Sequence, residues 1–285
     1  MGAPDIFDQR AWLTRIGYAG PLEPTLDALR ELVSAHAHAI AYESIDIILG
    51  RLPVLEVEAL QAKMIQRGRG GYCFEQNMLF REGLRSLGFS VTSLQGRVVR
   101  GLEIDAPRPA IHMLLRIDLP DGPYLADVGF GNLAPTGPLK LHPDVDQETP
   151  NELMRFVVVN DELTLQSRIA NKWEHIYRVI PYPRYDAEYE IVNWFTGTHP
   201  TSPYLSNIIA AIPVPGRGRV TLFNRRLTRR YVDGRVERWS LETETDFRQV
   251  LRETFGLNIS DEDVREAISV MDRRATRGPP HPFFA

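Results

Sequence analysis

The only cysteine of the chain, Cys73, follows closely on two consecutive glycines, Gly70 and Gly71. Consecutive glycines are typical of a backbone that turns sharply or admits a ligand closely. Apolar side chains at helical spacing follow the cysteine and place it at the N-terminus of a predicted helix. Unpaired amides and the helix dipole there favour a thiolate, the nucleophilic form of cysteine. The alternative for a lone cysteine is a small buried hydrophobic side chain.

Two polar side chains in strand-like apolar segments could complete a cysteine-based site. His112 stands in one such segment and Asp127 in the next, and a turn at Asp121 and Gly122 would join them. A carboxylate in an apolar strand is costly unless it is paired, so Asp127 needs a polar partner. Counting outward from the turn does not place His112 directly opposite Asp127 without a bulge or an offset. The alternative for His112 is a core or edge histidine. The chain order of cysteine, histidine and aspartate follows the logic of papain-like enzymes.

The elements that must position these side chains change in character along the chain. Helical periodicity dominates at first, and helices are expected over residues 22–35, 55–66 and 73–88. Strands are expected over residues 91–99, 110–119, 124–128, 154–159, 163–169 and 173–180. A meander over residues 220–224, 227–232 and 236–241 precedes two helices, one capped near Thr245 and one beginning at Ser260. The prolines and glycines of the middle third favour a small antiparallel barrel or sandwich over a parallel α/β sheet.

Composition narrows the class of protein. A chain of 285 residues can form two or three packed units. A formal net charge of -4 gives no overall attraction to nucleic acid or to an anionic membrane. The chain has no run of about 18 apolar residues, so no membrane-spanning helix is expected. The first residues lack a secretory signal, and a single cysteine excludes an internal disulfide, so the reducing cytoplasm is expected. The spacing of His36 and His38 does not suit one helical face, and no metal site is expected.

A series of motifs extends over nearly the whole chain. The motifs are RGGYC at residues 69–73, His112 with Met113, DVGFG at residues 127–131, NWF at residues 193–195, Thr198 to Pro200 with Ser202, and the Gly-Arg and strand pattern of residues 216–228. In content and order, this set resembles the arylamine N-acetyltransferase family. Each motif alone is unspecific, whereas the set at compatible spacings is specific.

The resemblance implies an α+β multidomain fold with a cysteine-proteinase-like triad core. A helical bundle over residues 1–88 would carry the nucleophile, a central antiparallel β-barrel over residues 89–195 would carry the histidine and the aspartate, and residues 196–285 would form an α/β lid. It also implies a monomer or weak homodimer that binds coenzyme A and a small-molecule acceptor, without nucleic acid, membrane or metal.

The implied activity is transfer of acetyl from acetyl-CoA to an arylamine, hydrazine or arylhydroxylamine, as in xenobiotic metabolism. The mechanism would be ping-pong, through an acetyl thioester on Cys73. His112 would hold Cys73 ionised, and Asp127 would fix the histidine tautomer and stabilise its charge.

The resemblance also implies roles for residues around the triad. Gly129, Phe130 and Gly131 match the loop beside the CoA pyrophosphate, although the same pattern is common in a turn after a strand. Phe130, Tyr42, Val98 and Tyr204 would wall the acceptor pocket. Glu43 and Arg69 match an ion pair that braces the nucleophile loop.

Two departures from the family pattern concern substrate range. Tyr42 and Tyr204 stand where the family commonly has phenylalanine, so two hydroxyls enter a normally apolar pocket. The triad is spared, so the departures bear on the acceptor and not on the reaction.

Other functions stay open at this point. An amide synthase of the same fold would take its acyl group from a carrier protein. A hydrolytic cysteine peptidase or transglutaminase-like enzyme would use the same triad, and a binding module could keep it as a relic. The arginines at positions 225, 226, 229 and 230 could hold CoA phosphates or simply form a solvated strand edge.

Overall fold

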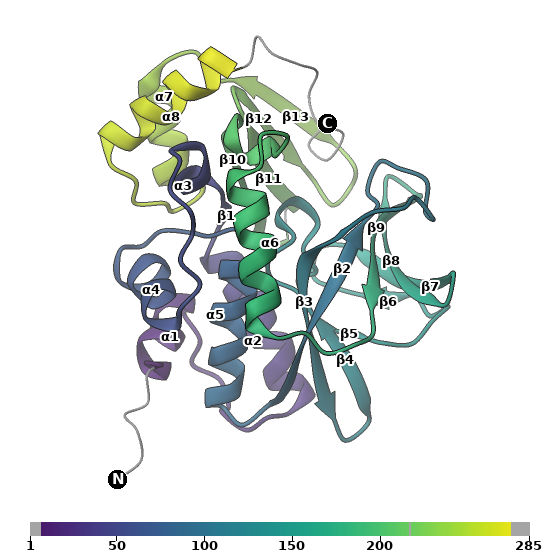
Figure 1. The fold of residues 1–285 in the computed structure, drawn as a ribbon. Coiled ribbons are helices and arrows are strands. Elements are labelled where there is room, and N and C mark those ends of the chain that lie inside the picture. Colours follow the sequence, from purple (N-terminus) through teal and green to yellow (C-terminus); the bar gives the residue numbers. More distant parts are fainter. Residues whose placement is uncertain (1–6, 217, 275–285) are drawn as a thin grey trace.

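The computed structural model describes residues 7–216 and 218–274 and shows N-terminal helices, an eight-stranded sheet, and a second sheet with C-terminal helices (Figure 1). The N-terminal helices are α1 (Gln9–Ile16), α2 (Leu26–Ala39), α3 (Ile45–Ile48), α4 (Val57–Leu60), which continues as a π-helical turn (Gln61–Gln66), and α5 (Cys73–Ser86). Helix α5 is buried on nearly every side because it lies between the other helices and the eight-stranded sheet. It packs closely on α1, since a Cβ at Gly83 would lie 2.6 Å from the ring of Trp12.

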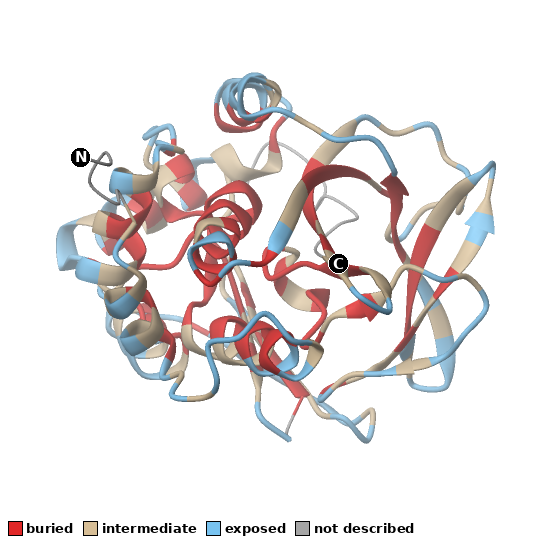
Figure 2. Cartoon of the chain, turned by 90° about the horizontal axis from the view of Figure 1, so that it is seen from below, coloured by how far each residue is buried: buried red, intermediate tan, exposed pale blue. Residues whose placement is uncertain are grey.

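The eight-stranded sheet is antiparallel and nearly closed into a barrel. Its strands, in spatial order, are β5 (Leu139–Lys140), β4 (Gly122–Ala126), β3 (Ala110–Leu119), β2 (Ser90–Val98), β9 (Lys172–Ile180), β8 (Glu162–Ile169), β7 (Leu153–Val159) and β6 (Gln147–Glu148). The segment after β5 bridges back to β7 at Pro143 and Phe156. Figure 2 shows the strands curving round a buried interior, which contains Leu114, Leu125 and Tyr177.

The second sheet joins distant parts of the sequence. Its order is β1 (Tyr42–Glu43), β10 (Ile209–Val214), β11 (Gly218–Phe223), β12 (Arg226–Arg230) and β13 (Val236–Ser240). Val220 and Leu222 on one face pack against α7 (Glu244–Gln249), the π-helical turn that continues it (Val250–Thr254) and α8 (Asp261–Arg274). The edge strand β1 comes from the N-terminal part, so this sheet holds Tyr42 in place.

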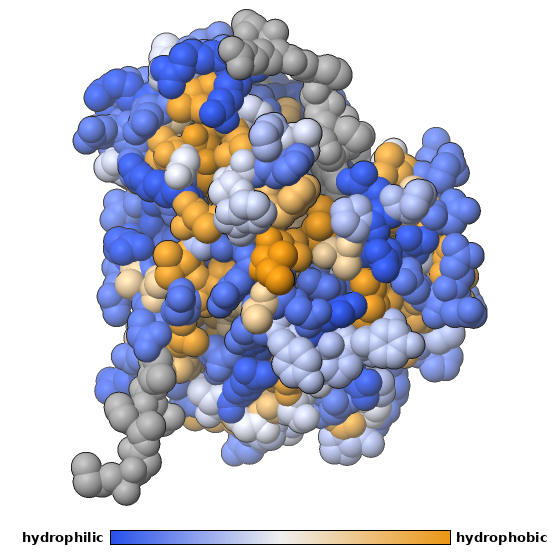
Figure 3. All heavy atoms as spheres, viewed as in Figure 1, coloured by the Kyte–Doolittle hydropathy of each residue, from blue (hydrophilic) through white to orange (hydrophobic). Residues whose placement is uncertain are grey.

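Helix α6 (Asp186–Thr198) carries the chain from the barrel to the second sheet, and the short helix η3 (Pro203–Leu205) follows it. The outer face of α6 exposes Ile191, Trp194 and Phe195. Figure 3 shows apolar surface over this helix. The sequence did not predict α6, because its apolar residues do not form the single buried face on which such predictions depend.

Most predicted elements correspond to observed ones. Of two predicted turns, one is confirmed and one is displaced by a residue. The turn at Asn160 and Asp161 is confirmed, with φ of 49° and 61° at the two residues. The turn predicted at Asp121 and Gly122 is wrong by one residue. Gly122 already pairs with Leu119, and its φ of 123° lets the strand begin there.

The predicted division at residues 88 and 195 stays a prediction. The boundary at residue 195 falls within α6. Strand β1, from the predicted helical part, pairs with β10, from the predicted lid. Within residues 7–216 and 218–274, no helix is both long and apolar enough to cross a membrane.

Candidate active site

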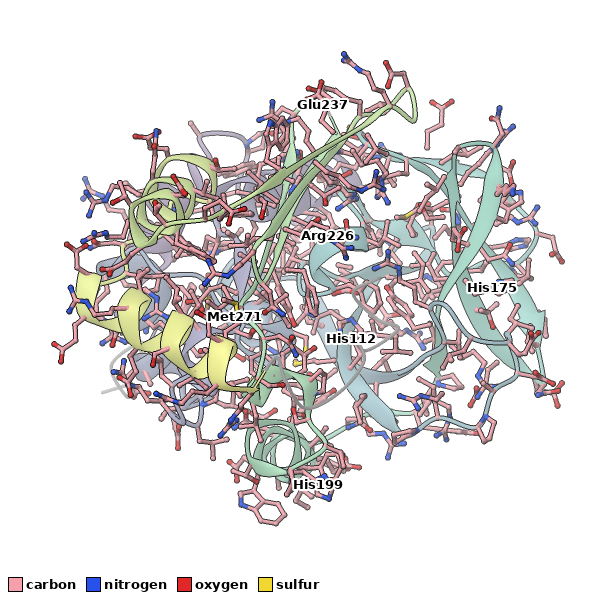
Figure 4. All side chains as sticks on the ribbon, turned by 90° about the horizontal axis from the view of Figure 1, so that it is seen from above. His112, His175, His199, Arg226, Glu237 and Met271 are labelled. Atoms are coloured by element: carbon pink, nitrogen blue, oxygen red, sulfur yellow. The ribbon has the colours of Figure 1, made fainter. Side chains whose placement is uncertain are left out.

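A cavity of about 490 Å³ lies where the helices, the barrel and the second sheet meet. Residues from all three parts line it, among them Tyr42, Cys73, Val98, His112, Phe130 and Tyr204. Among the histidines labelled in Figure 4, His112 lies in the interior of the molecule, whereas His175 lies on the barrel and His199 at the end of α6. The cysteine and the histidine singled out in the sequence therefore line the same cavity.

His112 and Asp127 are in direct contact. His112 Nε2 lies 2.8 Å from Asp127 Oδ2, and both side chains are buried. The ladder between β3 and β4 ends at Leu115 and Ala126, so Asp127 is the first residue beyond it and reaches back to His112 at an offset. The contact commits Nε2 to the carboxylate and leaves Nδ1 as the ring nitrogen for other chemistry.

Asn77 ties the aspartate loop to the nucleophile helix, and the sequence analysis missed it. Its Nδ2 donates to Asp127 Oδ1 at 2.9 Å and to the carbonyl of Met113 at 2.9 Å, and its Oδ1 accepts from Val128 N. Asp127 Oδ1 also accepts from Gly129 N. Burial alone would raise the pKa of Asp127, but His112, Asn77 and Gly129 outweigh it and hold that pKa below its ordinary value. The signal available in the sequence was an asparagine one turn after the cysteine.

Cys73 is the first residue of α5 and is 6% exposed. Burial raises the pKa of its thiol, and the charge of Asp127 raises it further, whereas the N–H groups of Phe74 and Met113 oppose the rise. The expectation that the helix terminus favours a thiolate stays a prediction, and burial of the thiol acts against it. An anionic sulfur in this site requires its proton to stay on a neighbouring base.

The loop of Gly129, Phe130 and Gly131 packs on the start of α5. A Cβ at Gly129 would lie 2.6 Å from Asn77 Nδ2 and 2.7 Å from the carbonyl oxygen of Cys73, so only glycine fits. The Phe130 ring lies edge-on to His112, with centroids 5.0 Å apart. Tyr177, which the sequence analysis did not single out, has its ring centroid 5.3 Å from that of the imidazole and 5.2 Å from that of Phe130. Two aromatic rings thus fix the histidine ring.

Glu43 and Arg69 form the expected contact, within a larger buried network. Arg69 Nη2 lies 2.7 Å from Glu43 Oε1 and 3.1 Å from Asp46 Oδ1. Lys63 bridges Asp46 at 2.6 Å and Glu75 at 2.8 Å. Burial lowers the pKa of Lys63, but the surrounding carboxylates outweigh it and raise that pKa above the ordinary value. Nothing in the sequence distinguished Lys63 from a surface lysine.

Glu75 connects this network to the nucleophile, because its Oε2 accepts the N–H of Tyr72, the residue before Cys73. The backbone just before Tyr72 also packs closely on its surroundings. A Cβ at Gly70 would lie 2.1 Å from the carbonyl oxygen of Ala41.

Two arginines of the cluster noted in the sequence lie close to acidic side chains. Arg225 pairs with Asp272 of α8 at 2.8 Å, and Arg230 lies 3.6 Å from Glu152. Within the part of the chain that the structure describes, the arginines that line the cavity are Arg100 and Arg108. The same described residues contain no group of three or more histidine, cysteine, aspartate or glutamate side chains placed to hold a metal ion.

Comparisons with known proteins show which family the chain is similar to. A family model described as N-acetyltransferase matches residues 25–264. The arylamine N-acetyltransferase of Mycobacterium tuberculosis is 36% identical over 278 residues, which cover 95% of this chain and 97% of that protein. The arylamine N-acetyltransferase / N-hydroxyarylamine O-acetyltransferase of Salmonella typhimurium is 34% identical over 88% of this chain and 89% of that protein. The structure of Mycobacterium marinum arylamine N-acetyltransferase in complex with CoA has a TM-score of 0.87 and 37% identity, covering 93% of this chain and 99% of that one.

Proposed function

The chain belongs to the arylamine N-acetyltransferase family, and from that premise we propose that it transfers acetyl from acetyl-CoA to an arylamine or hydrazine nitrogen through a thioester on Cys73. The observation that carries the proposal is the 2.8 Å contact of His112 with Asp127 beside a cavity that Cys73 also lines. This set of side chains is the one that nucleophilic acyl transfer requires.

The first half-reaction acetylates Cys73. The thiol proton passes to Nδ1 of His112, because Nε2 is committed to Asp127. The sulfur forms a bond to the acetyl carbon, the bond from that carbon to the sulfur of CoA breaks, and the leaving CoA thiolate takes the proton from His112. Because burial raises the pKa of the Cys73 thiol, the sulfur becomes anionic only as the imidazolium forms, and Asp127 stabilises that cation.

The second half-reaction transfers acetyl to the amine. The amine nitrogen attacks the thioester carbonyl, a C–N bond forms, and the C–S bond breaks with its electron pair returning to Cys73. The nitrogen loses one proton to His112, which passes it to the sulfur. The enzyme returns to its starting state, and the products are one amide and one CoA.

The glycine loop and the cavity wall suit the donor. Gly129 and Gly131 line the cavity together with Arg100 and Arg108, whose positive charge suits the phosphates of CoA. The CoA complex of the Mycobacterium marinum relative supports this donor. The reaction needs a reduced Cys73, so we also propose the reducing cytoplasm as its compartment.

Intact-protein mass spectrometry tests the mechanism. After mixing with acetyl-CoA alone, the wild-type protein should carry one acetyl group, and an arylamine or hydrazine should remove it. Cys73→Ala should stay unmodified, while Ser86→Ala, a change at the exposed end of α5, should acetylate like wild type. A wild-type protein that acetyl-CoA leaves unmodified but a carrier-bound acyl group modifies would replace the proposal with the amide synthase alternative.

A further inference from the structure

Two tyrosine hydroxyls meet at the wall of the cavity. Tyr42 Oη donates to Tyr204 Oη at 3.1 Å. The two residues are far apart in the sequence, since Tyr42 belongs to β1 and Tyr204 to η3, and both line the cavity that contains Cys73 and His112.

The pair is held in place from both sides before any ligand binds. Tyr42 pairs with Ala211 of β10, and its ring packs on Gly131, where a Cβ would lie 3.2 Å from the ring. The Tyr204 ring lies edge-on to Tyr72, with centroids 6.1 Å apart. A polar group fixed in this way orients a ligand at little further cost in conformational entropy.

The surrounding wall is largely apolar, with Val98, Ile111, Phe130 and Phe195 among its residues. Burial raises the pKa of Tyr42 well above its ordinary value, and Tyr204 and Cys73 add to the effect, so this hydroxyl stays neutral. Tyr42 gives its proton to Tyr204 and keeps the lone pairs of its own oxygen for a donor from the ligand. In an apolar pocket, a few fixed polar groups decide which ligand is accepted.

We propose that the Tyr42–Tyr204 pair selects arylamine acceptors that carry a hydrogen-bond donor on the ring, the aminophenol class, with Tyr42 Oη accepting that hydrogen bond. The inference rests on the proposed function, because it concerns the second half-reaction. An amine substrate without the donor group displaces water from the Tyr42 oxygen but makes no hydrogen bond in its place. The unpaired oxygen disfavours binding of that amine.

The test compares 4-aminophenol with 4-methoxyaniline as acceptors for the acetyl-enzyme. The two substituents are similar in electron donation, but only the hydroxyl can donate a hydrogen bond. The methoxy group is larger by one methyl group, and Tyr42→Phe controls for that difference because it leaves the space in the pocket nearly unchanged. The enzyme is loaded with acetyl-CoA, freed of CoA and mixed with either amine, and loss of the acetyl group is timed. The ratio of the two rates cancels differences in loading between variants. Wild type should favour 4-aminophenol by about 10-fold or more, because the other acceptor leaves one buried hydrogen-bond acceptor of the site unpaired.

Variants separate the pair from the rest of the pocket. Tyr42→Phe removes the accepting oxygen and should bring the ratio near one. Tyr204→Phe releases the proton of Tyr42 for donation to the methoxy oxygen and should also lower the ratio. Tyr182→Phe, at an exposed tyrosine, should keep the wild-type ratio. Equal rates in wild type, or a ratio that survives Tyr42→Phe, would overturn the inference and leave the proposed function standing. Failure of Cys73 to load would overturn both.

Discussion

Asn77 Nδ2 donates to Asp127 Oδ1 at 2.9 Å, and this bond joins the helix that begins at Cys73 to the segment after β4, whose Asp127 contacts His112. The same amide group also accepts from Val128 N, so one side chain fixes both the carboxylate and its backbone. Asn77 therefore links the proposed nucleophile, Cys73, to the aspartate that contacts its proposed base, His112.

Asn77→Ala should slow acetylation of Cys73 by roughly 10-fold or more, because the loss of buried hydrogen bonds to a charged group costs about 1–3 kcal/mol. Rapid mixing with acetyl-CoA and mass detection measures the rate. Gln249→Ala, which removes an exposed contact with Glu253, is the control and should leave the rate unchanged. A wild-type rate in Asn77→Ala would show that the loop holds its position without it.

Asp127→Asn should reduce acetylation by roughly 10³–10⁴-fold. The asparagine amide can donate to His112 Nε2, which forces the ring proton onto Nδ1 and removes the base that Cys73 needs. The acetylation rate, measured against pH, checks this. If the asparagine variant loads at a rate within about 10-fold of wild type, the tautomer argument fails.

His36 should make the fold sensitive to acid. Burial lowers its pKa from 6.5 to about 4, and its ring bonds to Trp12 and Gln76 are made by the neutral form. Between these pH values the unfolded chain binds a proton that the folded chain does not, so stability falls as pH falls, by at most about 1.4 kcal/mol per unit. Stability should be fully retained above pH 6.5.

Urea unfolding at several pH values measures the His36 effect. His36→Gln should flatten the slope between pH 6.5 and 4, while His142→Gln, at an exposed histidine, should leave it intact. An unchanged slope in His36→Gln would assign the acid sensitivity to other groups.

What the sequence predicted well depended on local chemistry. The segment around Cys73 contains its own helix start, and residues 110–119 form β3 as expected, because strand formers and turn residues act over short distances. Tyr177 and Lys63 could not be found in this way. Their importance arises from residues that approach them only in the folded chain, and their local patterns are those of a strand tyrosine and a surface lysine.

Lys63→Met should destabilise the fold by roughly 3–5 kcal/mol, because it leaves the buried carboxylate of Glu75 without its cation and Asp46 with Arg69 alone. Guanidinium unfolding measures the loss. Lys172→Met, at an exposed lysine, is the matched control and should change stability little. Equal stability of the two variants would mean that Arg69 alone compensates the network.

Gly129→Ala should nearly abolish acetylation of Cys73. A methyl group at this position would lie 2.6 Å from Asn77 Nδ2 and 2.7 Å from the carbonyl oxygen of Cys73, so the loop must move away from α5 and carry Asp127 with it. The control is Gly137→Ala, where the nearest atom lies 3.7 Å away and a methyl group fits. If small thioesters, which lack the CoA phosphates, load Gly129→Ala at the wild-type rate, the glycine serves phosphate access and not the packing of the loop. If neither donor loads it, the close approach of this loop to α5 is what sets the geometry of the site.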